Sequence, residues 1–189
     1  MRVIAGEHKG RRLSPPKGKG VRPTSGRVKE ALFSILGDRT VEARFLDLFA
    51  GTGAIGIEAL SRGARSATFV EDTAASLKVL RDNLDRCGLT SSARVHPCSA
   101  ETFMRREAGQ SVFDIIFADP PYHDDIIANL LPAIERAGIM APDSLVVVEH
   151  FTKVSAPPQA GRLTLRRQYR YGDTRLSIYH AISERECCP

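Results

Sequence analysis

The sequence lacks the features that mark metal-binding, disulfide-rich and membrane-spanning proteins. Its four cysteines form no Cys-x-x-Cys pair and no cluster with histidine at zinc spacing, so we expect reduced thiols and no metal site. No apolar run approaches the roughly 20 residues that cross a bilayer, and the first residues hold no apolar leader. We therefore expect a cytoplasmic protein with no membrane partner. No internal repeat or long low-complexity tract is present either. The 189 residues, 42% of them hydrophobic, suit one α/β domain with short extensions.

Positive charge is present but unevenly placed. Residues 1–29 hold nine lysines and arginines against one acid, Glu7, whereas the other 160 residues carry 18 bases and 21 acids. The net charge of +5 therefore comes from a basic N-terminal arm on a mildly acidic body. Such an arm suits contact with nucleic-acid phosphates, although a solvated leader could have the same composition. A second cluster near the C-terminus contains Arg162, Arg166, Arg167, Arg170 and Arg175.

Strand and helix patterns alternate through most of the chain. Two short extended stretches in the Gly/Pro-rich residues 1–23 predict a small hairpin, and an amphipathic helix follows from a cap at Thr24 or Ser25 to Gly37. Further on, apolar strands alternate with helices, and the stretches that flank Gly172 predict a terminal antiparallel hairpin. The expected strands are 45–49, 66–70, 93–96, 113–118, 145–149, 163–171 and 176–180, and the expected helices are 54–62, 73–86, 100–107 and 124–137.

This alternation predicts the fold class. Repeated strand–helix units form a mostly parallel sheet with helices on both faces, and ligands bind at the carboxyl ends of its strands. We expect an α/β domain over residues 24–182, a basic hairpin or arm over 1–23, and a C-terminal tail over 183–189.

A glycine-rich turn follows the first expected strand of this domain. Gly51, Gly53 and Gly56 match G-x-G-x-x-G between a strand and a helix, and Glu71 ends the next strand 20 residues after Gly51, where a carboxylate can accept ribose hydroxyls. Asp47 would repel a pyrophosphate but attract the ammonium and sulfonium groups of S-adenosylmethionine. We interpret the turn as a site for that cofactor rather than as a purely structural turn. The cofactor-binding residues expected here are Asp47, Ala50, Gly51, Thr52, Gly53, Glu71 and Asp72.

The loop after the fourth expected strand reads Asp119-Pro120-Pro121-Tyr122. The two prolines carry no amide hydrogen, so the turn offers acceptors without donors, which suits a substrate that is itself an –NH2 donor. Asp119 and the Pro120 carbonyl can accept the two amine hydrogens and direct the nitrogen lone pair to a methyl donor, while Tyr122 can stack on the base. We therefore expect Asp119, Pro120 and Tyr122 to be the catalytic residues, although a rigid polar turn is the alternative.

At these two loops the chain resembles the class I methyltransferases. It is more closely similar to the bacterial RsmD family, the 16S ribosomal RNA guanine N2-methyltransferases. The resemblance extends to about His180 and includes four further stretches: Arg2–Gly6, Lys9–Leu13, Arg22–Phe33 and Tyr171–Thr174.

The resemblance implies the remaining expectations about fold, cofactor and substrate. It implies a seven-stranded methyltransferase sheet with a C-terminal antiparallel hairpin and a small N-terminal β-hairpin extension. Ser99 and Ala100 would lie near the adenine of S-adenosylmethionine and Thr24 near its methionine end. The substrate would be guanine N2 in small-subunit ribosomal RNA, within an assembling ribosomal particle, and the enzyme would be a monomer. The residues expected to bind RNA are Lys9, Arg11, Arg12, Lys17 and Arg22.

We expect direct methyl transfer without a covalent enzyme intermediate, and three alternatives stay open. A DNA amino-methyltransferase acting on adenine N6 or cytosine N4 would use the same chemistry, but the chain has no obvious DNA-recognition domain. A nicotinamide-dependent oxidoreductase would share the glycine turn, but Asp47 and the Asp119 loop argue against it. A non-catalytic RNA-binding protein would not need both loops intact.

Overall fold

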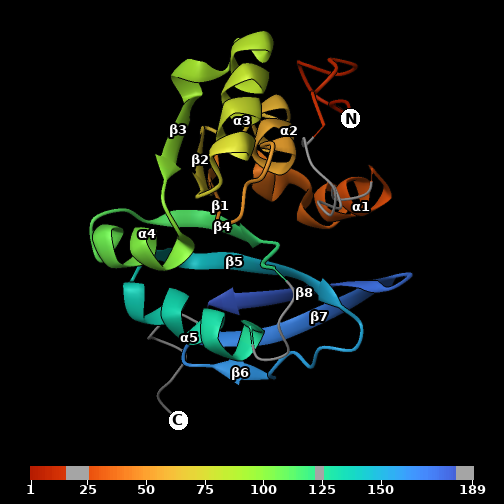
Figure 1. Cartoon of the computed structure of the whole chain (residues 1–189). Coiled ribbons are helices and arrows are strands. Elements are labelled where there is room, and N and C mark those ends of the chain that lie inside the picture. The colour runs from red at the N-terminus through yellow and green to blue at the C-terminus, as the bar shows by residue number, and fades with distance from the viewer. Residues whose placement is uncertain (16–25, 122–125, 182–189) are drawn as a thin grey trace. The chain divides into compact units, whose positions relative to one another are not determined.

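The computed structural model describes residues 1–15, 26–121 and 126–181, coloured along the chain in Figure 1. Four residues with predicted roles, Lys17, Arg22, Thr24 and Tyr122, lie outside the described residues, as does the predicted tail 183–189. The chain divides into two compact units, Met1–Ala100 and Glu101 to the C-terminus. No helix in the described ranges is both long and apolar enough to cross a membrane.

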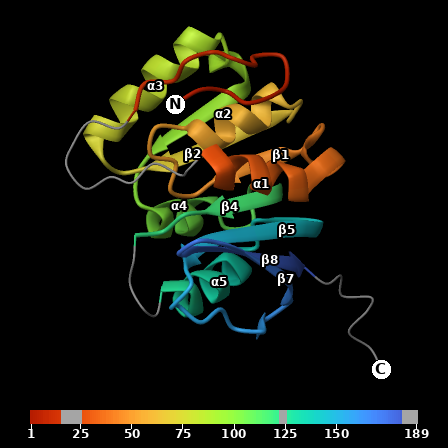
Figure 2. The ribbon, with the colours of Figure 1, turned by 90° about the vertical axis from the view of Figure 1, so that its right-hand side faces the viewer.

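The first unit is built on three parallel strands in the order β3-β2-β1. Residues at the middle of β1 and β2 are buried, as expected of strands that are covered on both faces, whereas β3, at the end of this order, has only half-buried and exposed residues. Helices α2 and α3 lie alongside these strands (Figure 2). The elements of this unit are α1 (Gly26–Leu36), β1 (Arg44–Asp47), α2 (Ala54–Ser61), β2 (Ser66–Glu71), α3 (Ala74–Cys87) and β3 (Ala93–Pro97), with 3-10 turns at Gly37–Thr40 and Thr90–Ser92.

The N-terminal segment forms the predicted hairpin. Arg2 and Arg12 make an antiparallel bridge, and the Leu13 amide donates to the Met1 carbonyl at 3.0 Å. Val3 and Leu13 are 1% and 3% exposed, so both arms of the hairpin contribute apolar side chains to the first unit. The described part of the basic arm is therefore packed on the unit rather than a solvated leader.

The second unit holds strands in the order β4-β5-β8-β7-β6. Strands β4 and β5 are parallel, whereas β8, β7 and β6 are antiparallel to their neighbours, which confirms the predicted terminal hairpin. Apolar residues from the middle of β4, β5 and β8 form its core. Its elements are α4 (Ala100–Glu107), β4 (Phe113–Ala118), α5 (Ile126–Ala137), β5 (Met140–Phe151), β6 (Gln159–Ala160), β7 (Leu163–Tyr171) and β8 (Thr174–Ala181).

Several element ends lie one or two residues from their predicted positions, and three further details differ from the predictions. Strand β5 begins at Met140 instead of 145, because its pairing with β4 shifts register over a stretch in which Asp143 has φ of 59°. The two-residue β6 was not predicted, and it brings the strands of the described residues to eight. The helix expected over 73–86 begins instead at Ala74, and Thr73 lies at its N-cap position with its hydroxyl donating to Asp72.

Candidate functional site

The glycine turn between β1 and α2 is shaped by contacts within the first unit. A Cβ on Gly53, whose φ is 79°, would lie 2.2 Å from the Leu80 side chain, and a Cβ on Gly56 would lie 2.3 Å from the Phe69 ring. A Cβ on Gly51 would meet nothing within 4 Å. Gly53 and Gly56 are therefore required by packing, whereas Gly51 borders open space in which a ligand could approach the backbone.

Glu71, at the end of β2, holds the turn in place. Its Oε2 accepts a hydrogen bond from the Gly51 amide at 2.8 Å, and its Oε1 accepts one from the Thr73 amide at 2.8 Å. The side chain is half-buried, so it is not sealed from a ligand. Because each carboxylate oxygen has a second lone pair, Glu71 can still accept the ribose hydroxyls of a nucleoside.

Asp47, the last residue of β1, is 1% exposed. Its Oδ2 accepts a hydrogen bond from the Gly56 amide at 3.3 Å, in the first turn of α2, where the helix dipole favours a negative charge. Asp47 therefore orients the helix that follows the glycine turn. A role in attracting the cationic end of S-adenosylmethionine stays a prediction.

The other predicted cofactor residues follow the carboxyl ends of the same three strands. These ends lie at one edge because the strands are parallel. Ala50 and Thr52 are buried in the glycine turn, and Asp72 is exposed just after β2. Ser99, half-buried, and Ala100, buried, follow β3. The structure thus gathers nine of the ten predicted cofactor residues in the first unit; the tenth, Thr24, is outside the described residues.

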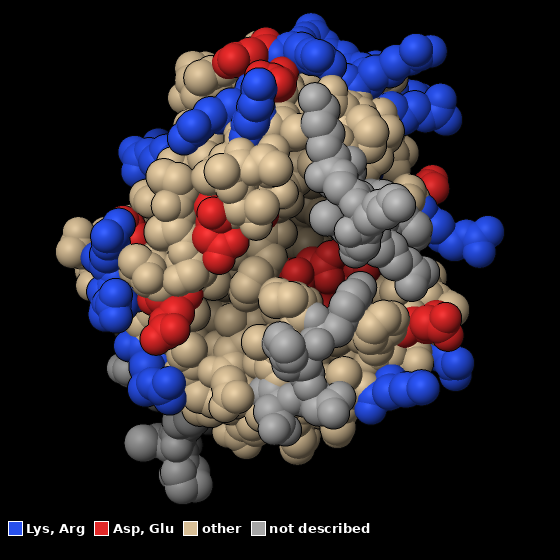
Figure 3. Space-filling view, in the orientation of Figure 1, with Lys and Arg blue, Asp and Glu red and all other residues tan. Residues whose placement is uncertain are grey.

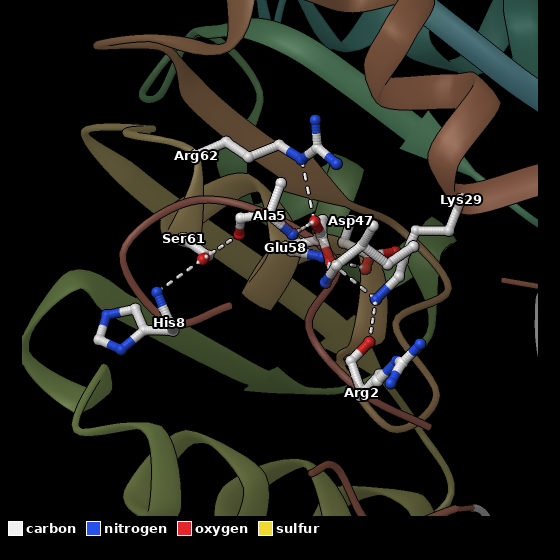
Figure 4. A network of polar contacts seen from close by, with 10 residues as sticks. Arg2, Ala5, His8, Lys29, Asp47, Glu58, Ser61 and Arg62 are labelled. Atoms are coloured by element: carbon white, nitrogen blue, oxygen red, sulfur yellow. Dashed lines mark hydrogen bonds and ion pairs between the residues drawn. The ribbon is translucent and has the colours of Figure 1, made fainter. Parts of the chain in front are cut away.

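A polar network that the sequence did not predict ties the N-terminal segment to α2 (Figure 4). Its centre is Glu58, which is 0% exposed. Glu58 accepts hydrogen bonds from the amides of Ile4 and Ala5 at 2.8 and 2.9 Å. It also forms ion pairs with Lys29 at 2.8 Å and Arg62 at 2.9 Å. Burial by itself would raise the pKa of Glu58, but Lys29, the Ile4 amide and Arg62 outweigh it and hold the pKa below the ordinary value of 4.5.

The backbones of the N-terminal segment and α2 also approach each other closely next to this network. The Ser61 hydroxyl donates to the Ala5 carbonyl at 2.6 Å and accepts from the His8 amide at 3.0 Å. Gly6 has φ of 81°, and a Cβ there would lie 1.7 Å from the Ser61 carbonyl oxygen. Only glycine fits at this position. An acid within the otherwise apolar helix Ala54–Ser61 is the sequence signal that could have revealed the network.

Asn83 on α3 links the N-terminal segment directly to the glycine turn. Its Oδ1 accepts from the Ser14 amide at 2.8 Å, while its Nδ2 donates to the Thr52 carbonyl at 3.0 Å and to the Ser14 carbonyl at 3.3 Å. Asn83 is 0% exposed. One buried amide therefore contacts both the basic arm and the candidate cofactor loop.

The predicted RNA-binding residues that the structure describes are Lys9, Arg11 and Arg12, and all three are exposed. Arg11 donates from Nη1 to the Arg86 carbonyl at 2.8 Å, so it lies against the end of α3. Figure 3 shows Lys and Arg side chains over the upper part of the view, where Figure 1 draws α3 and the N-terminal segment. This placement leaves the basic residues available to an external anion.

In the second unit, Asp119 and Pro120 follow β4 directly. Asp119 is half-buried and Pro120 is buried. The last pair between β4 and β5 is Ala118 with Val148, so the next residue of β5, Glu149, lies at the same strand end as Asp119. Glu149 is 5% exposed. This second carboxylate was not predicted from the sequence, although an acid that follows an apolar run of a strand is a recognisable signal.

Next to Glu149, His150 is 2% exposed and joins β5 to β8. Its Nδ1 lies 2.8 Å from the Phe151 carbonyl oxygen and its Nε2 lies 2.7 Å from the Ser177 hydroxyl. Burial lowers the pKa of His150, and the positive charge of Arg175 lowers it further against the opposing effect of the Phe151 carbonyl. The imidazole is therefore neutral near pH 7, and this strand end carries no cation from His150.

Comparison with known proteins places this arrangement in a family. The family model described as "Conserved hypothetical protein 95" matches residues 1–180. YlbH of Bacillus subtilis is 39% identical over 183 residues, which cover 95% of this chain and 98% of that protein. Ribosomal RNA small subunit methyltransferase D of Escherichia coli is 33% identical over 186 residues, covering 98% of this chain and 92% of that protein.

A solved structure shows the same fold. The protein yhhF from Escherichia coli superposes with a TM-score of 0.86 at 33% identity, covering 97% of this chain and 99% of that one. The predicted class I methyltransferase fold is thus confirmed. The chain belongs to the RsmD family of methyltransferases, whose family model is described as conserved hypothetical protein 95.

Proposed function

We propose that the protein transfers a methyl group from S-adenosylmethionine to the exocyclic N2 amine of a guanine in small-subunit ribosomal RNA. The observation that carries this proposal is the acceptor-only turn after β4, where half-buried Asp119 precedes two prolines. The name of the Escherichia coli relative supports ribosomal RNA as the substrate. The cytoplasm and an assembling small subunit, as the setting of the reaction, are part of the same proposal.

The residues of the first unit suit the proposed cofactor. S-adenosylmethionine, when bound, supplies an electrophilic methyl group on a sulfonium. The open space at Gly51 allows it to lie against the backbone, and Glu71, fixed by the Gly51 and Thr73 amides, can accept its ribose hydroxyls. The buried charge of Asp47 favours a cation nearby. These features fit a nucleoside with a positive charge better than one with a pyrophosphate.

The residues after β4 suit the proposed acceptor. An exocyclic amine is a weak nucleophile because its lone pair is delocalised into the ring. The Asp119 carboxylate and the Pro120 carbonyl would each accept one amine hydrogen, which holds the lone pair toward the methyl carbon. The new N–C bond forms as the C–S bond breaks, and the surplus amine proton leaves to Asp119 or water. Tyr122 would stack on the extruded base.

The test is a labelling experiment with three substrates in parallel. Wild-type protein and radiolabelled S-adenosylmethionine are incubated with unmodified small-subunit rRNA, with small ribosomal subunits that lack the modification, and with DNA, and the labelled base is identified. Label at guanine N2 in either RNA sample is the expected result. Label in DNA, or on an adenine of the rRNA, would overturn the assignment of the substrate.

The role of Asp119 is tested separately with Asp119→Ala and Asp119→Asn. We expect Asp119→Ala to lower kcat by roughly 10²–10³ while the dissociation constant for S-adenosylmethionine stays within about twofold, because an acceptor used in the transition state is lost. Asp119→Asn keeps one acceptor oxygen and should retain more activity than Asp119→Ala. Unchanged turnover in both variants would show that the carboxylate does not act on the amine.

A further inference from the structure

An arginine-rich strand in the second unit has no part in the function proposed so far. Residues 163–175 of the β7–β8 hairpin contain four arginines and one acid, Asp173. Arg166, Arg167 and Arg170 are exposed, and Arg175 is half-buried. Such a run could be a solvated surface, so its position in the sheet decides what it can do.

Most of β7 forms an open edge of the sheet. Strand β6 pairs only with Leu163 and Thr164, whereas β8 pairs with β7 along its whole length. The Leu165 amide also donates to the Pro158 carbonyl at 2.9 Å, so within the described ranges residues 166–171 have a strand on one side only. An open edge this long invites pairing with another strand, and charged side chains are a common protection against it. The arginines block another protein strand but would attract a polyanion.

A β-bulge places these cations on both faces of the edge. Leu165 pairs with Tyr179 and Arg167 pairs with the next residue of β8, Ile178, so Arg166 is an extra residue in β7. Side chains alternate beyond this point: Arg167 shares one face with Tyr169 and Tyr171, whereas Arg170 lies on the other. The cations thus follow the edge itself rather than one face.

The hairpin turn lies at the carboxyl end of β5, as does the Asp119 loop. Phe151, the last residue of β5, pairs with Thr174, which also pairs with Tyr171 of β7. Strand β4 runs parallel to β5 and ends at Ala118. Figure 1 shows the turn of the β7–β8 hairpin extending past the arrowhead of β5. Within the second unit, the β7–β8 turn therefore lies at the same end of the sheet as Asp119 and Glu149, with β8 between β7 and β5.

Two of the guanidinium groups are partly held by local contacts. Arg170 donates from Nε to the Gly172 carbonyl at 3.0 Å, and Arg167 Nη1 lies 3.5 Å from the Tyr169 hydroxyl. Each contact uses one of the five donors of a guanidinium group. The remaining donors suit phosphate oxygens, and the charge of Arg175 next to neutral His150 adds to the positive field.

We propose that this arginine edge, made of Arg166, Arg167, Arg170 and Arg175, binds phosphates of the RNA strand whose base is presented to Asp119. Arg167 and Arg170 are separated by about 10 Å along the strand, at 3.3–3.4 Å per residue, so they reach different phosphates of a polyanion. RNA is favoured over an acidic protein because the edge leads to the loop where a base must be placed. The proposal rests on the proposed function and names where the substrate backbone runs.

The test compares two triple variants with equal changes in charge. Arg166→Gln/Arg167→Gln/Arg170→Gln removes three cations from the edge. The control, Arg105→Gln/Arg106→Gln/Arg136→Gln, removes three exposed arginines near the C-terminal ends of α4 and α5, on the chain segments that lead into the amino ends of β4 and β5. Binding of an unmodified small-subunit rRNA transcript is measured over a series of salt concentrations, with thermal melting to verify that each variant is folded.

The edge variant should bind the transcript at least tenfold more weakly at low salt. The slope of log K against log salt should flatten by roughly 2–3, because each lost phosphate contact removes about 0.7–0.9 from the slope. The control should change the slope by less than about 1. Methyl transfer by the edge variant should show a raised KM for RNA with kcat retained at saturating RNA. Equal slopes for wild type and the edge variant, or equal losses in both variants, would overturn the proposal.

The same data separate this proposal from the proposed function. Wild-type protein that binds S-adenosylmethionine but labels no guanine in rRNA would refute the proposed function. The salt dependence of RNA binding by the edge variant would still test whether the arginine edge binds RNA. Guanine labelling by the wild type, together with an unchanged salt slope in the edge variant, would refute only the RNA-binding role of the arginine edge.

Discussion

Glu58→Gln should destabilise the protein strongly, because it removes the buried charge at the centre of the polar network around α2. Glu58 is 0% exposed, and Lys29, its ion-pair partner at 2.8 Å, is 4% exposed. Replacing the carboxylate leaves a buried ammonium without its counter-charge. Removing one partner of a buried pair costs about 3–5 kcal/mol, a large share of the ~5–15 kcal/mol that stabilises a typical domain.

Urea denaturation followed by circular dichroism measures this loss. With an m-value of about 2 kcal/mol/M, the expected destabilisation lowers the urea midpoint by roughly 1.5–2.5 M. The double variant Lys29→Met/Glu58→Gln removes both charges. Its loss of unfolding free energy should therefore be smaller than the sum of the losses measured for Glu58→Gln and Lys29→Met separately. A loss below about 1 kcal/mol for Glu58→Gln would show that the network contributes little.

The pH dependence provides an independent check of the same residue. Because the pKa of Glu58 is lower in the folded protein than in the unfolded chain, its ionisation contributes stability above the unfolded value of about 4.5. That contribution is lost as the pH falls through the lower, folded pKa. Wild-type stability should therefore decline below about pH 4.5 more steeply than that of Glu58→Gln. Parallel curves for the two proteins would contradict the assigned charge state.

The remaining two predictions concern the glycine turn and its support. Gly56→Ala should lower stability by about 1–3 kcal/mol, because its Cβ would lie 2.3 Å from the Phe69 ring. Gly51→Ala meets no clash, but its φ of 53° costs an alanine about 1–2 kcal/mol, and it should bind S-adenosylmethionine at least tenfold more weakly. Thermal melting and calorimetric titration measure these outcomes, and equal losses of cofactor affinity in the two variants would refute the different roles of the two glycines. Asn83→Ala leaves the Thr52 carbonyl without the hydrogen bond from Asn83, so it should cost about 1–3 kcal/mol and weaken cofactor binding as well. If truncating Asn83 changed stability but not cofactor affinity, the link from Ser14 to the glycine turn would be structural only.

The sequence predicted the regular elements where local signals are strong. Residues 100–107, 113–118 and 163–171 have the predicted bounds, because an apolar face or an alternating pattern continues to a clear stop. The predicted start of β5 was wrong: Pro142 and Asp143 are residue types common in turns, yet the strand continues through them in an irregular register. The short β6 depends on its pairing with β7, which no local pattern reveals.

The candidate site was predictable to a similar degree. The positions of the glycine turn, Glu71 and Asp119 follow from motifs that place loops at strand ends. The motif could not distinguish Gly51, which borders open space, from Gly56, which packs on Phe69 of β2. Contacts between residues far apart in the chain were missed, since Glu58 meets Ile4 across 54 positions and Asn83 meets Ser14 across 69.

The long sequence separations of the contacts made by Glu58 and Asn83 also determine the order in which contacts can form during synthesis. Ile4 and Ala5 are synthesised well before Glu58, and Ser14 before Asn83, so the N-terminal segment cannot complete its contacts until α3 exists. At a translation rate of about 5–20 residues per second, that wait lasts on the order of several seconds. During this time Val3 and Leu13, which are buried in the finished protein, lack part of the structure that buries them. The first unit can therefore close only after the helix that carries Asn83 has been synthesised, which makes its N-terminal segment a late step in folding on the ribosome.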